Sequence, residues 1–285
     1  MSIYIYQKNA ILGKKVRIFS YLFTCEIDFF FKKVYNDVME KYQYKQQFEI
    51  RYRDVDFKDE MKASVALTFM EEVAGASADE LGFGYRFLKP NGYAFVVSNT
   101  CIEFIRPISL FEKINLKTWP LPPTYATFQR EYLFEDEKGA RVAAASSRWC
   151  LLDCRNGKIL PSKCIEGQDY STYNTDQALE NVQWKLPKVD IQEQNPDFVI
   201  TIANSEYDHN LHVNNTRYCD YALNCFTLAQ LREKRVKKLS LTYAKQCYEG
   251  ETLRFYKTEL ADGSFIVQGL NQANERVIQV QIIFA

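Results

Sequence analysis

The chain alternates between stretches with a two-residue hydrophobic period and stretches with a period of three to four residues. From Tyr42, the sequence QYKQQFEIRYRDVD predicts a strand with Phe48, Ile50 and Tyr52 on one face. The following SVALTFMEEVAGASADELGF predicts an amphipathic helix with Ser64 as its N-cap. The buried face of this helix is predicted to hold Val65, Leu67, Met70, Val73 and Ala74. Strand patterns then follow at 93–105, 112–121, 125–136 and 141–153.

The same order of elements recurs in the second half. A strand pattern at 197–208 precedes a single predicted helix over 214–235, and four strand patterns follow it. The buried side of this helix is predicted to hold Tyr218, Tyr221, Cys225, Leu228 and Ala229. The segment 55–64 aligns with 207–216 at a constant offset, which pairs Asp56 with Asp208, Lys58 with Asn210 and Glu60 with His212. The repeat predicts an α+β domain duplicated in tandem.

This pattern divides the chain into four parts. We expect an N-terminal extension at 1–41, a first domain at 42–170, a linker at 171–194 and a second domain at 195–285 that carries the candidate site. The apolar run at 18–25 is too short to cross a bilayer, which takes about 20 residues. Met39 is an alternative start of translation, so no function is assigned to the extension.

Composition narrows the classes of function. Lys plus Arg and Asp plus Glu both number 36, and this balance favours neither a nucleic-acid partner nor an anionic membrane. The eight cysteines form no C-x-x-C pair, and the histidines complete no zinc-binding spacing. We therefore expect no metal or cofactor, no membrane span and a reducing, cytoplasmic location.

Both histidines of the chain lie in the segment EYDHNLHVNN. In an extended segment, Asp208, Asn210 and His212 would project to one side and present a carboxylate, an amide and an imidazole. A helix beginning at Asn214 or Asn215 would offer free N–H groups to a carbonyl oxygen, at roughly 3–4 kcal/mol per donor. This arrangement predicts hydrolysis of an activated acyl group. The alternative is a polar turn that only caps the helix, with His212 an ordinary turn residue. His209 is read as a surface residue, because it points away from the alternating set.

The segment YDHNLHVNNTRY resembles the D-x-N-x-H-V-N-N motif of the acyl–acyl-carrier-protein thioesterases. Other segments resemble the same family in the same order: RYRDVDFKDEMKASVALTFMEEVAGASADELG, FVVSNTCIEFIRPI and LTYAKQC. The resemblance runs from about Tyr42 to Ala285. It implies a tandem double hotdog, in which two antiparallel sheets each wrap a long central helix.

The resemblance also implies roles for individual residues. Asp208 would be the catalytic carboxylate, Asn210 its amide partner and His212 the imidazole. A later Glu of the family corresponds to Gln246, which cannot act as a base and leaves open a slow or inactive enzyme. Glu249 follows in the same segment, read as a strand, and is a candidate substitute for the family Glu. Substrate contacts would fall to Val213, Asn214, Asn215 and Cys247.

The implied substrate is a fatty acyl thioester on acyl carrier protein. The acyl chain would lie between helix and sheet, near the aromatic residues Phe83, Tyr85, Phe87, Tyr93 and Phe95. The acidic carrier could dock on the basic residues Arg232, Lys234, Arg235, Lys237 and Lys238, unless these form only a solvated surface. A monomer and a homodimer both remain open. The alternatives are an acyl-coenzyme A thioesterase, a non-catalytic acyl-binding protein and, more distantly, a hotdog dehydratase.

Overall fold

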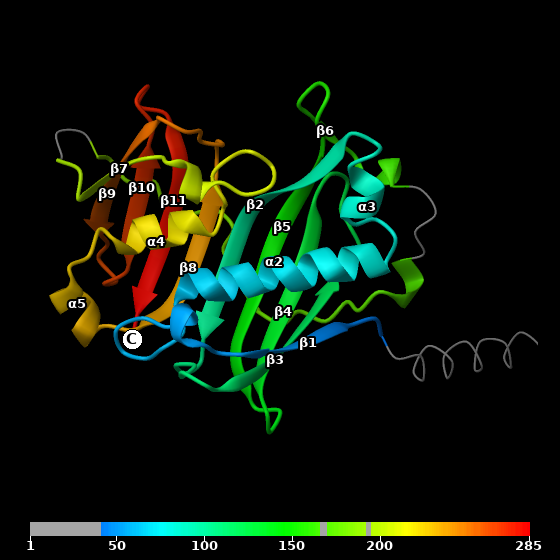
Figure 1. Cartoon of the computed structure of the whole chain (residues 1–285), viewed down its shortest axis with the longest axis horizontal. Coiled ribbons are helices and arrows are strands. Elements are labelled where there is room, and N and C mark those ends of the chain that lie inside the picture. Colours follow the sequence, from blue (N-terminus) through cyan, green and yellow to red (C-terminus); the bar gives the residue numbers. More distant parts are fainter. Residues whose placement is uncertain (1–40, 166–169, 192–194) are drawn as a thin grey trace, which may run out of the picture. The chain divides into compact units, whose positions relative to one another are not determined.

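The computed structural model describes residues 41–165, 170–191 and 195–285, and Tyr42–Ala285 forms one compact unit. Its first half contains a long helix and six strands (Figure 1). The elements are β1 (Tyr44–Glu49), α2 (Ala63–Glu80), α3 (Tyr85–Leu88), β2 (Tyr93–Phe104), β3 (Lys113–Pro120), β4 (Phe128–Asp136), β5 (Arg141–Asp153) and β6 (Lys158–Leu160). Short 3-10 turns lie at Tyr52–Asp54, Ser162–Cys164 and Tyr170–Thr172.

The second half repeats a strand, helical segments and four strands. Its elements are β7 (Phe198–Thr201), a 3-10 turn at Asn204–Glu206, α4 (Arg217–Leu223), α5 (Leu228–Glu233), β8 (Val236–Tyr243), β9 (Thr252–Glu259), β10 (Phe265–Leu270) and β11 (Arg276–Phe284). Within the described residues, no helix is both long enough and apolar enough to span a membrane.

All strands belong to one antiparallel sheet, in the order β1-β3-β4-β5-β2-β8-β11-β10-β9-β7, with β6 paired to β5. The halves meet where β2 pairs with β8, from Asn99 opposite Thr242 to Glu103 opposite Lys238. The prediction of two separate sheets therefore differs from the structure. Without this pairing, β2 and β8 would each leave an edge of unpaired N–H and C=O groups, and joining the edges satisfies both.

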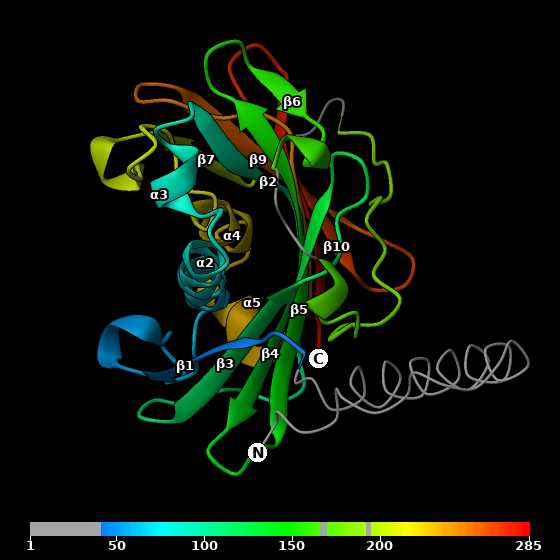
Figure 2. The ribbon, with the colours of Figure 1, turned by 90° about the vertical axis from the view of Figure 1, so that its right-hand side faces the viewer.

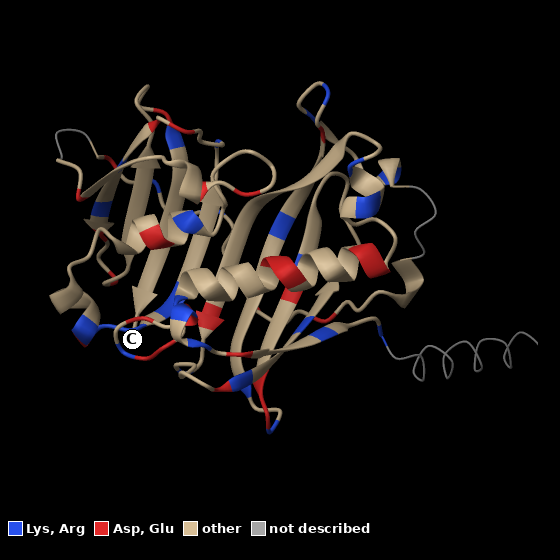
Figure 3. Cartoon of the chain, in the orientation of Figure 1, with Lys and Arg blue, Asp and Glu red and all other residues tan. Residues whose placement is uncertain are grey.

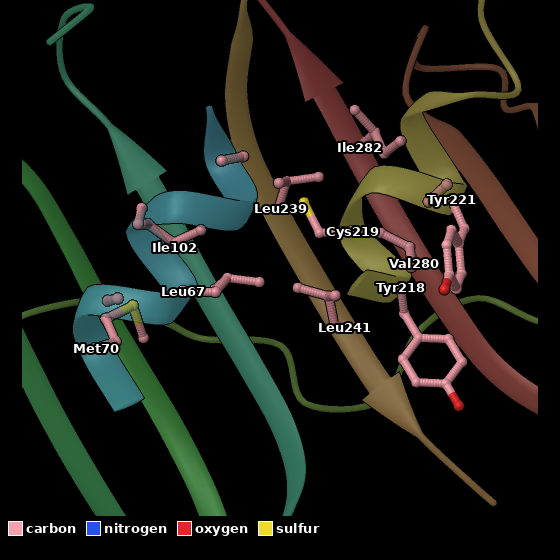
Figure 4. Packing of buried hydrophobic residues seen from close by; sticks show 14 of the residues in the cluster. Leu67, Met70, Ile102, Tyr218, Cys219, Tyr221, Leu239, Leu241, Val280 and Ile282 are labelled. Carbon is pink, nitrogen blue, oxygen red and sulfur yellow. The ribbon is translucent and has the colours of Figure 1, made fainter. Parts of the chain in front are cut away.

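The helices α2 and α4 contact each other and lie on the same face of the sheet (Figure 2). Figure 4 shows their apolar side chains meeting those of β2, β8 and β11 in one layer. The predicted buried face of α2 is confirmed at Leu67, Met70, Val73 and Ala74. The helix begins one residue before Ser64, and Lys62 takes the N-cap position, so the predicted cap is wrong.

The single helix predicted over 214–235 is also wrong, because the chain breaks at Thr227. This residue has an extended backbone, and its hydroxyl accepts a hydrogen bond from the backbone N–H of Gln230, 3.2 Å away. The Gln230 side chain in turn accepts from the Thr227 N–H at 2.9 Å. This reciprocal cap starts α5 as a separate helix. The predicted buried side therefore ends at Cys225, and Leu228 is exposed.

The turns that precede α2 and α4 have the same hydrogen bonds, which confirms the sequence alignment of the two halves. The N–H of Asp56 donates to the carbonyl of Glu60 at 2.8 Å, and the N–H of Asp208 donates to that of His212 at 3.0 Å. Asp59 and Leu211 occupy equivalent positions with φ of 57° and 63°. Fold and turn are therefore conserved between the halves, while the side chains differ.

Candidate functional site

The candidate residues Asp208, Asn210 and His212 lie in a tight turn between the bridged residues Tyr207 and Val213. The segment is not extended, so the prediction that these side chains project to one side of a strand is wrong. Instead the turn folds back, and His212 Nδ1 comes within 3.8 Å of Asp208 Oδ2. The backbone N–H of Asn210 donates to Asp208 Oδ1 at 2.7 Å, and its side-chain amide donates to Asp208 Oδ2 at 3.4 Å. The three side chains therefore form one partly buried to exposed cluster.

The contacts of His212 determine which of its nitrogens is free. Nδ1 lies 3.1 Å from the carbonyl oxygen of Val213. A carbonyl oxygen can only accept, so this bond requires the proton on Nδ1 and leaves Nε2 of the neutral ring as a proton acceptor. The 3.8 Å separation from Asp208 is too long for a hydrogen bond, but the carboxylate lies close enough to stabilise a positive charge on the ring.

A buried carboxylate anchors the turn to α4. Glu206 accepts hydrogen bonds from Arg217 Nε at 2.7 Å, from Arg217 Nη2 at 3.1 Å and from Tyr221 Oη at 2.5 Å. The hydrogen bonds from Arg217 keep the pKa of Glu206 below its ordinary value. Its backbone carbonyl accepts from the N–H of Asn214 at 2.9 Å. This network fixes where the turn ends relative to the helix.

The predicted oxyanion site at the start of the helix is not formed as expected. The helix α4 begins at Arg217, after Asn214 and Asn215, and has seven residues. The side-chain oxygen of Asn214 accepts from both the N–H and the hydroxyl of Thr216, at 2.8 and 2.7 Å. Asn214 therefore caps the chain ahead of α4, and the Thr216 N–H is not free for a carbonyl oxygen.

The predicted contact residues Val213 and Cys247 are buried neighbours. The N–H of Val213 donates to the carbonyl of Cys247 at 3.1 Å. Burial raises the pKa of the Cys247 thiol to about 11, which keeps it protonated at neutral pH. Cys247 thus has the character of a packing residue rather than of a nucleophile.

Gln246 lies apart from this buried pair. It is exposed, and its side-chain oxygen accepts from Tyr248 Oη at 3.0 Å. The strand β8 ends at Tyr243, so Gln246 and Glu249 lie in a loop. The expectation that Glu249 follows Gln246 along a strand is therefore wrong.

A small cavity lies between α2 and the sheet, next to the residues that follow His212. Its volume of about 10 Å³ suffices for a single water molecule. Most of its wall comes from the first half, while Asn215 and Tyr243 come from the second. The lining residues are Leu67, Met70, Glu71, Val97, Thr100, Tyr132, Ser147, Trp149, Asn215 and Tyr243.

Glu71 is the residue of this region that the sequence reading missed. It lies on the partly buried side of α2 and lines the cavity. Burial and the nearby charge of Asp208 raise its pKa to about 7, although hydrogen bonds from Asn215 and Asn214 act in the opposite direction. The sequence held a signal for it. Glu71 follows Leu67 by four residues and Met70 by one, so a carboxylate borders the apolar face of a helix.

The predicted acyl-binding aromatics do not line this cavity. Phe83, Tyr93 and Phe95 pack in a separate core cluster, while Tyr85 and Phe87 are exposed. Tyr85 instead meets the imidazole of His209 edge-on, with ring centroids 5.4 Å apart. His209, read as an isolated surface residue, thus joins the turn to α3 of the first half.

The predicted docking residues are largely engaged within the chain. Arg235 Nε lies 2.8 Å from Glu60, and Lys238 Nζ lies 3.3 Å from Glu103. Lys234 lies over the rings of Phe265 and Phe284. Lys and Arg also occur around α3, near the other end of the molecular face seen in Figure 3. Lys234, Arg235 and Lys238 thus have partners within the chain, while Arg232 and Lys237 are exposed.

Family comparison matches residues 41–162 to the acyl-ACP thioesterase N-terminal domain and residues 192–284 to the acyl-ACP thioesterase C-terminal domain. The chain belongs to the acyl-ACP thioesterase family. A solved acyl-ACP thioesterase from Bacteroides thetaiotaomicron is similar with a TM-score of 0.77 and 24% identity, over 85% of this chain and 98% of that one. The 12:0-ACP thioesterase from Umbellularia californica gives a TM-score of 0.76 and 17% identity, over 85% and 97%. The fold is thus hotdog-like.

Two curated relatives are longer proteins than this chain. The chain is 21% identical over 224 residues to a chloroplastic palmitoyl-acyl carrier protein thioesterase from Arabidopsis thaliana, covering 74% of this chain and 54% of that protein. It is 22% identical over 217 residues to the chloroplastic acyl-[acyl-carrier-protein] hydrolase FATB2 from Cuphea viscosissima, covering 72% and 52%. The chain therefore spans about half the length of the curated relatives it matches.

Proposed function

We propose that this protein hydrolyses fatty acyl thioesters of acyl carrier protein, releasing a free fatty acid and the carrier. Family membership supports the substrate class. The observation that carries the chemistry is the approach of His212 to Asp208 at 3.8 Å, with the Asp208 carboxylate held by Asn210. These three residues supply a proton acceptor, a charge that stabilises it and an amide that fixes the charge.

In the proposed reaction, His212 Nε2 removes a proton from water while the water oxygen attacks the thioester carbonyl carbon. Asp208 stabilises the imidazolium that forms. The carbon–sulfur bond then breaks, and the sulfur leaves with the proton that His212 returns. The products are a carboxylic acid and the free thiol of the carrier, and His212 ends neutral. Gln246 takes no part in this reaction, because it is exposed and its amide cannot act as an acid or a base.

The domain bounds, the position of the acyl chain and the oligomeric state are proposed from membership of the family. Each half would act as one hotdog unit, with the first domain at 42–170, the linker at 171–194 and the second domain at 195–285. The acyl chain would lie between α2 and the sheet, beyond the cavity at Met70 and Trp149. Because this cavity holds little more than a water molecule, the apolar side chains around it must move to admit the chain. The two halves already share one sheet, which suits a monomer as well as a homodimer.

A cytoplasmic location also belongs to the proposal. The cysteines among the described residues are unpaired, as expected in a reducing compartment.

A panel of thioesters tests this function. Acyl carrier proteins and coenzyme A, each loaded with saturated chains of several lengths, are incubated with the full chain and with Asp208→Ala and His212→Ala. We expect hydrolysis of the carrier-bound thioesters and a loss of about 10² or more in each variant. Faster hydrolysis of the coenzyme A series would favour the acyl-coenzyme A alternative. Acyl binding without hydrolysis by the unaltered chain would overturn the enzymatic proposal.

A further inference from the structure

The cavity beside the turn has a polar wall that both halves of the chain build. Glu71 of α2 and Asn215 of the second half line it, with the hydroxyl-bearing residues Thr100 and Ser147. The Asn215 amide lies close enough to the Glu71 carboxylate to favour its ionised form. Asn215 stands three residues after His212, and Asp208 is close enough to act on the charge of Glu71, so this wall lies near the proposed hydrolytic site. The space holds one oxygen-sized atom and is bounded by groups that can donate hydrogen bonds.

The proposed reaction needs such donors. A thioester carbonyl oxygen gains negative charge when water attacks, and hydrogen-bond donors placed at that oxygen lower the barrier. The start of α4 does not provide them as expected, because Asn214 already binds the N–H of Thr216. A neutral carboxylic acid is a suitable donor, provided that its surroundings keep it protonated near neutral pH.

Several ionisable groups act on Glu71. Asp208 of the turn and Glu72 of the same helix add negative charge, which favours the protonated form. From the sheet, the phenols of Tyr132 on β4 and Tyr243 on β8 lie close enough to interact with its charge. Burial acts in the same direction and is the largest influence, so the pKa of Glu71 rises to about 7. An ordinary exposed Glu would be almost wholly ionised at that pH.

We propose that protonated Glu71, together with the amide of Asn215, binds the thioester carbonyl oxygen and stabilises its negative charge during hydrolysis. This inference rests on the proposed thioesterase function and assigns a catalytic residue to the half of the chain that lacks histidine. No covalent bond to Glu71 forms, and the acid keeps its proton throughout. In the second half, the position equivalent to Glu71 is Leu223, so the duplicated fold supplies this acid from α2 alone.

The Glu71→Gln variant separates this role from the alternatives. A Gln side chain has the same shape and remains a neutral donor at every pH. We expect hydrolysis by Glu71→Gln within about threefold of the unaltered protein at pH 6. Above pH 7 the unaltered protein loses the protonated acid, so the ratio of variant to unaltered rate should rise about thirtyfold by pH 8.5. Glu71→Ala, which removes the donor, should lose about 10² or more at pH 6.

The ratio of rates cancels any titration that both proteins share. Glu80→Gln is the matched control, since Glu80 is exposed at the far end of the same helix, and its ratio should stay constant with pH. A Glu71→Gln rate reduced by 10² or more at all pH values would assign Glu71 to proton removal and overturn the inference. A flat ratio would overturn it as well. A wholly inactive unaltered protein would instead refute the proposed function, so the two failures are distinguishable.

Discussion

The network around Glu206 offers a quantitative test of how the turn is held in place. Glu206 is 9% exposed, and its carboxylate accepts two hydrogen bonds from Arg217, one from Tyr221 and a longer one of 3.5 Å from Ser205 Oγ. The change to Gln keeps the size of the side chain but removes its charge. It also replaces one accepting oxygen with an NH₂ group that faces the donors of Arg217.

The expected cost can be worked out from these contacts. Hydrogen bonds to charged groups each contribute about 1.5–3 kcal/mol. The Arg217 side chain is 41% exposed, and solvent screening reduces the value of its bonds. We therefore expect Glu206→Gln to lower the free energy of unfolding by about 2 kcal/mol. Urea denaturation followed by circular dichroism measures this, as a lower midpoint with an unchanged slope.

The stability difference between the two proteins should also depend on pH, in a direction that the pKa of Glu206 fixes. Because the folded-state pKa of Glu206 is lowered, its contribution is present above the unfolded-state pKa and is lost as the pH falls through the folded-state value. The difference between the two proteins should therefore shrink in acid. Glu259→Gln, at the exposed end of β9, is the control and should change stability little. A Glu206→Gln protein within 0.5 kcal/mol of the unaltered one at pH 7 would refute this account of the anchor.

Three further predictions concern packing and the buried charged and thiol groups. Gly269→Ala should cost about 1–3 kcal/mol in urea denaturation, because the new Cβ would lie 2.7 Å from Ile278 Cγ2; an unchanged midpoint would contradict this. Cys247, whose pKa is raised to about 11, should resist iodoacetamide until the protein unfolds, and Cys247→Ala should keep its hydrolytic activity. Arg130 is buried and donates to the hydroxyls of Ser77 and Thr118, but no carboxylate among the described residues pairs with its charge; Arg130→Met should therefore leave the urea midpoint unchanged or raise it, whereas a clear fall would contradict this.

Local patterns in the sequence predicted most of the elements, since each pattern reflects which face is buried. The strand predicted at 141–153 is β5 with the same bounds, because turn residues flank a long run that is buried at most of its positions. The helix 214–235 was mispredicted, because a continuous apolar period hides the break at Thr227. The spacing of Thr227 and Gln230 was nevertheless a readable helix-start signal. The pairing of β2 with β8 joins residues about 140 positions apart, and no local pattern encodes such a contact.

The candidate site was predictable in its residues but not in its geometry. The sequence placed Asp208 and His212 together, yet a turn and not an extended strand brings them close. The turn depends on Leu211 at φ 63°, a conformation that leucine rarely adopts and that the sequence gives no reason to expect. Glu71 was missed because its approach to Asn215 is a contact between the halves, which appears only once the sheet is assembled.

The most direct test of the central claim is the intact mass of an acyl carrier protein after incubation with the full chain. The account predicts that the mass falls by that of the acyl group, with a free thiol and a free fatty acid produced together. With His212→Ala, the rate should fall by about 10² or more. An acyl carrier protein that keeps its acyl group in the presence of the unaltered chain, for every chain length tried, would contradict the claim that this site hydrolyses thioesters.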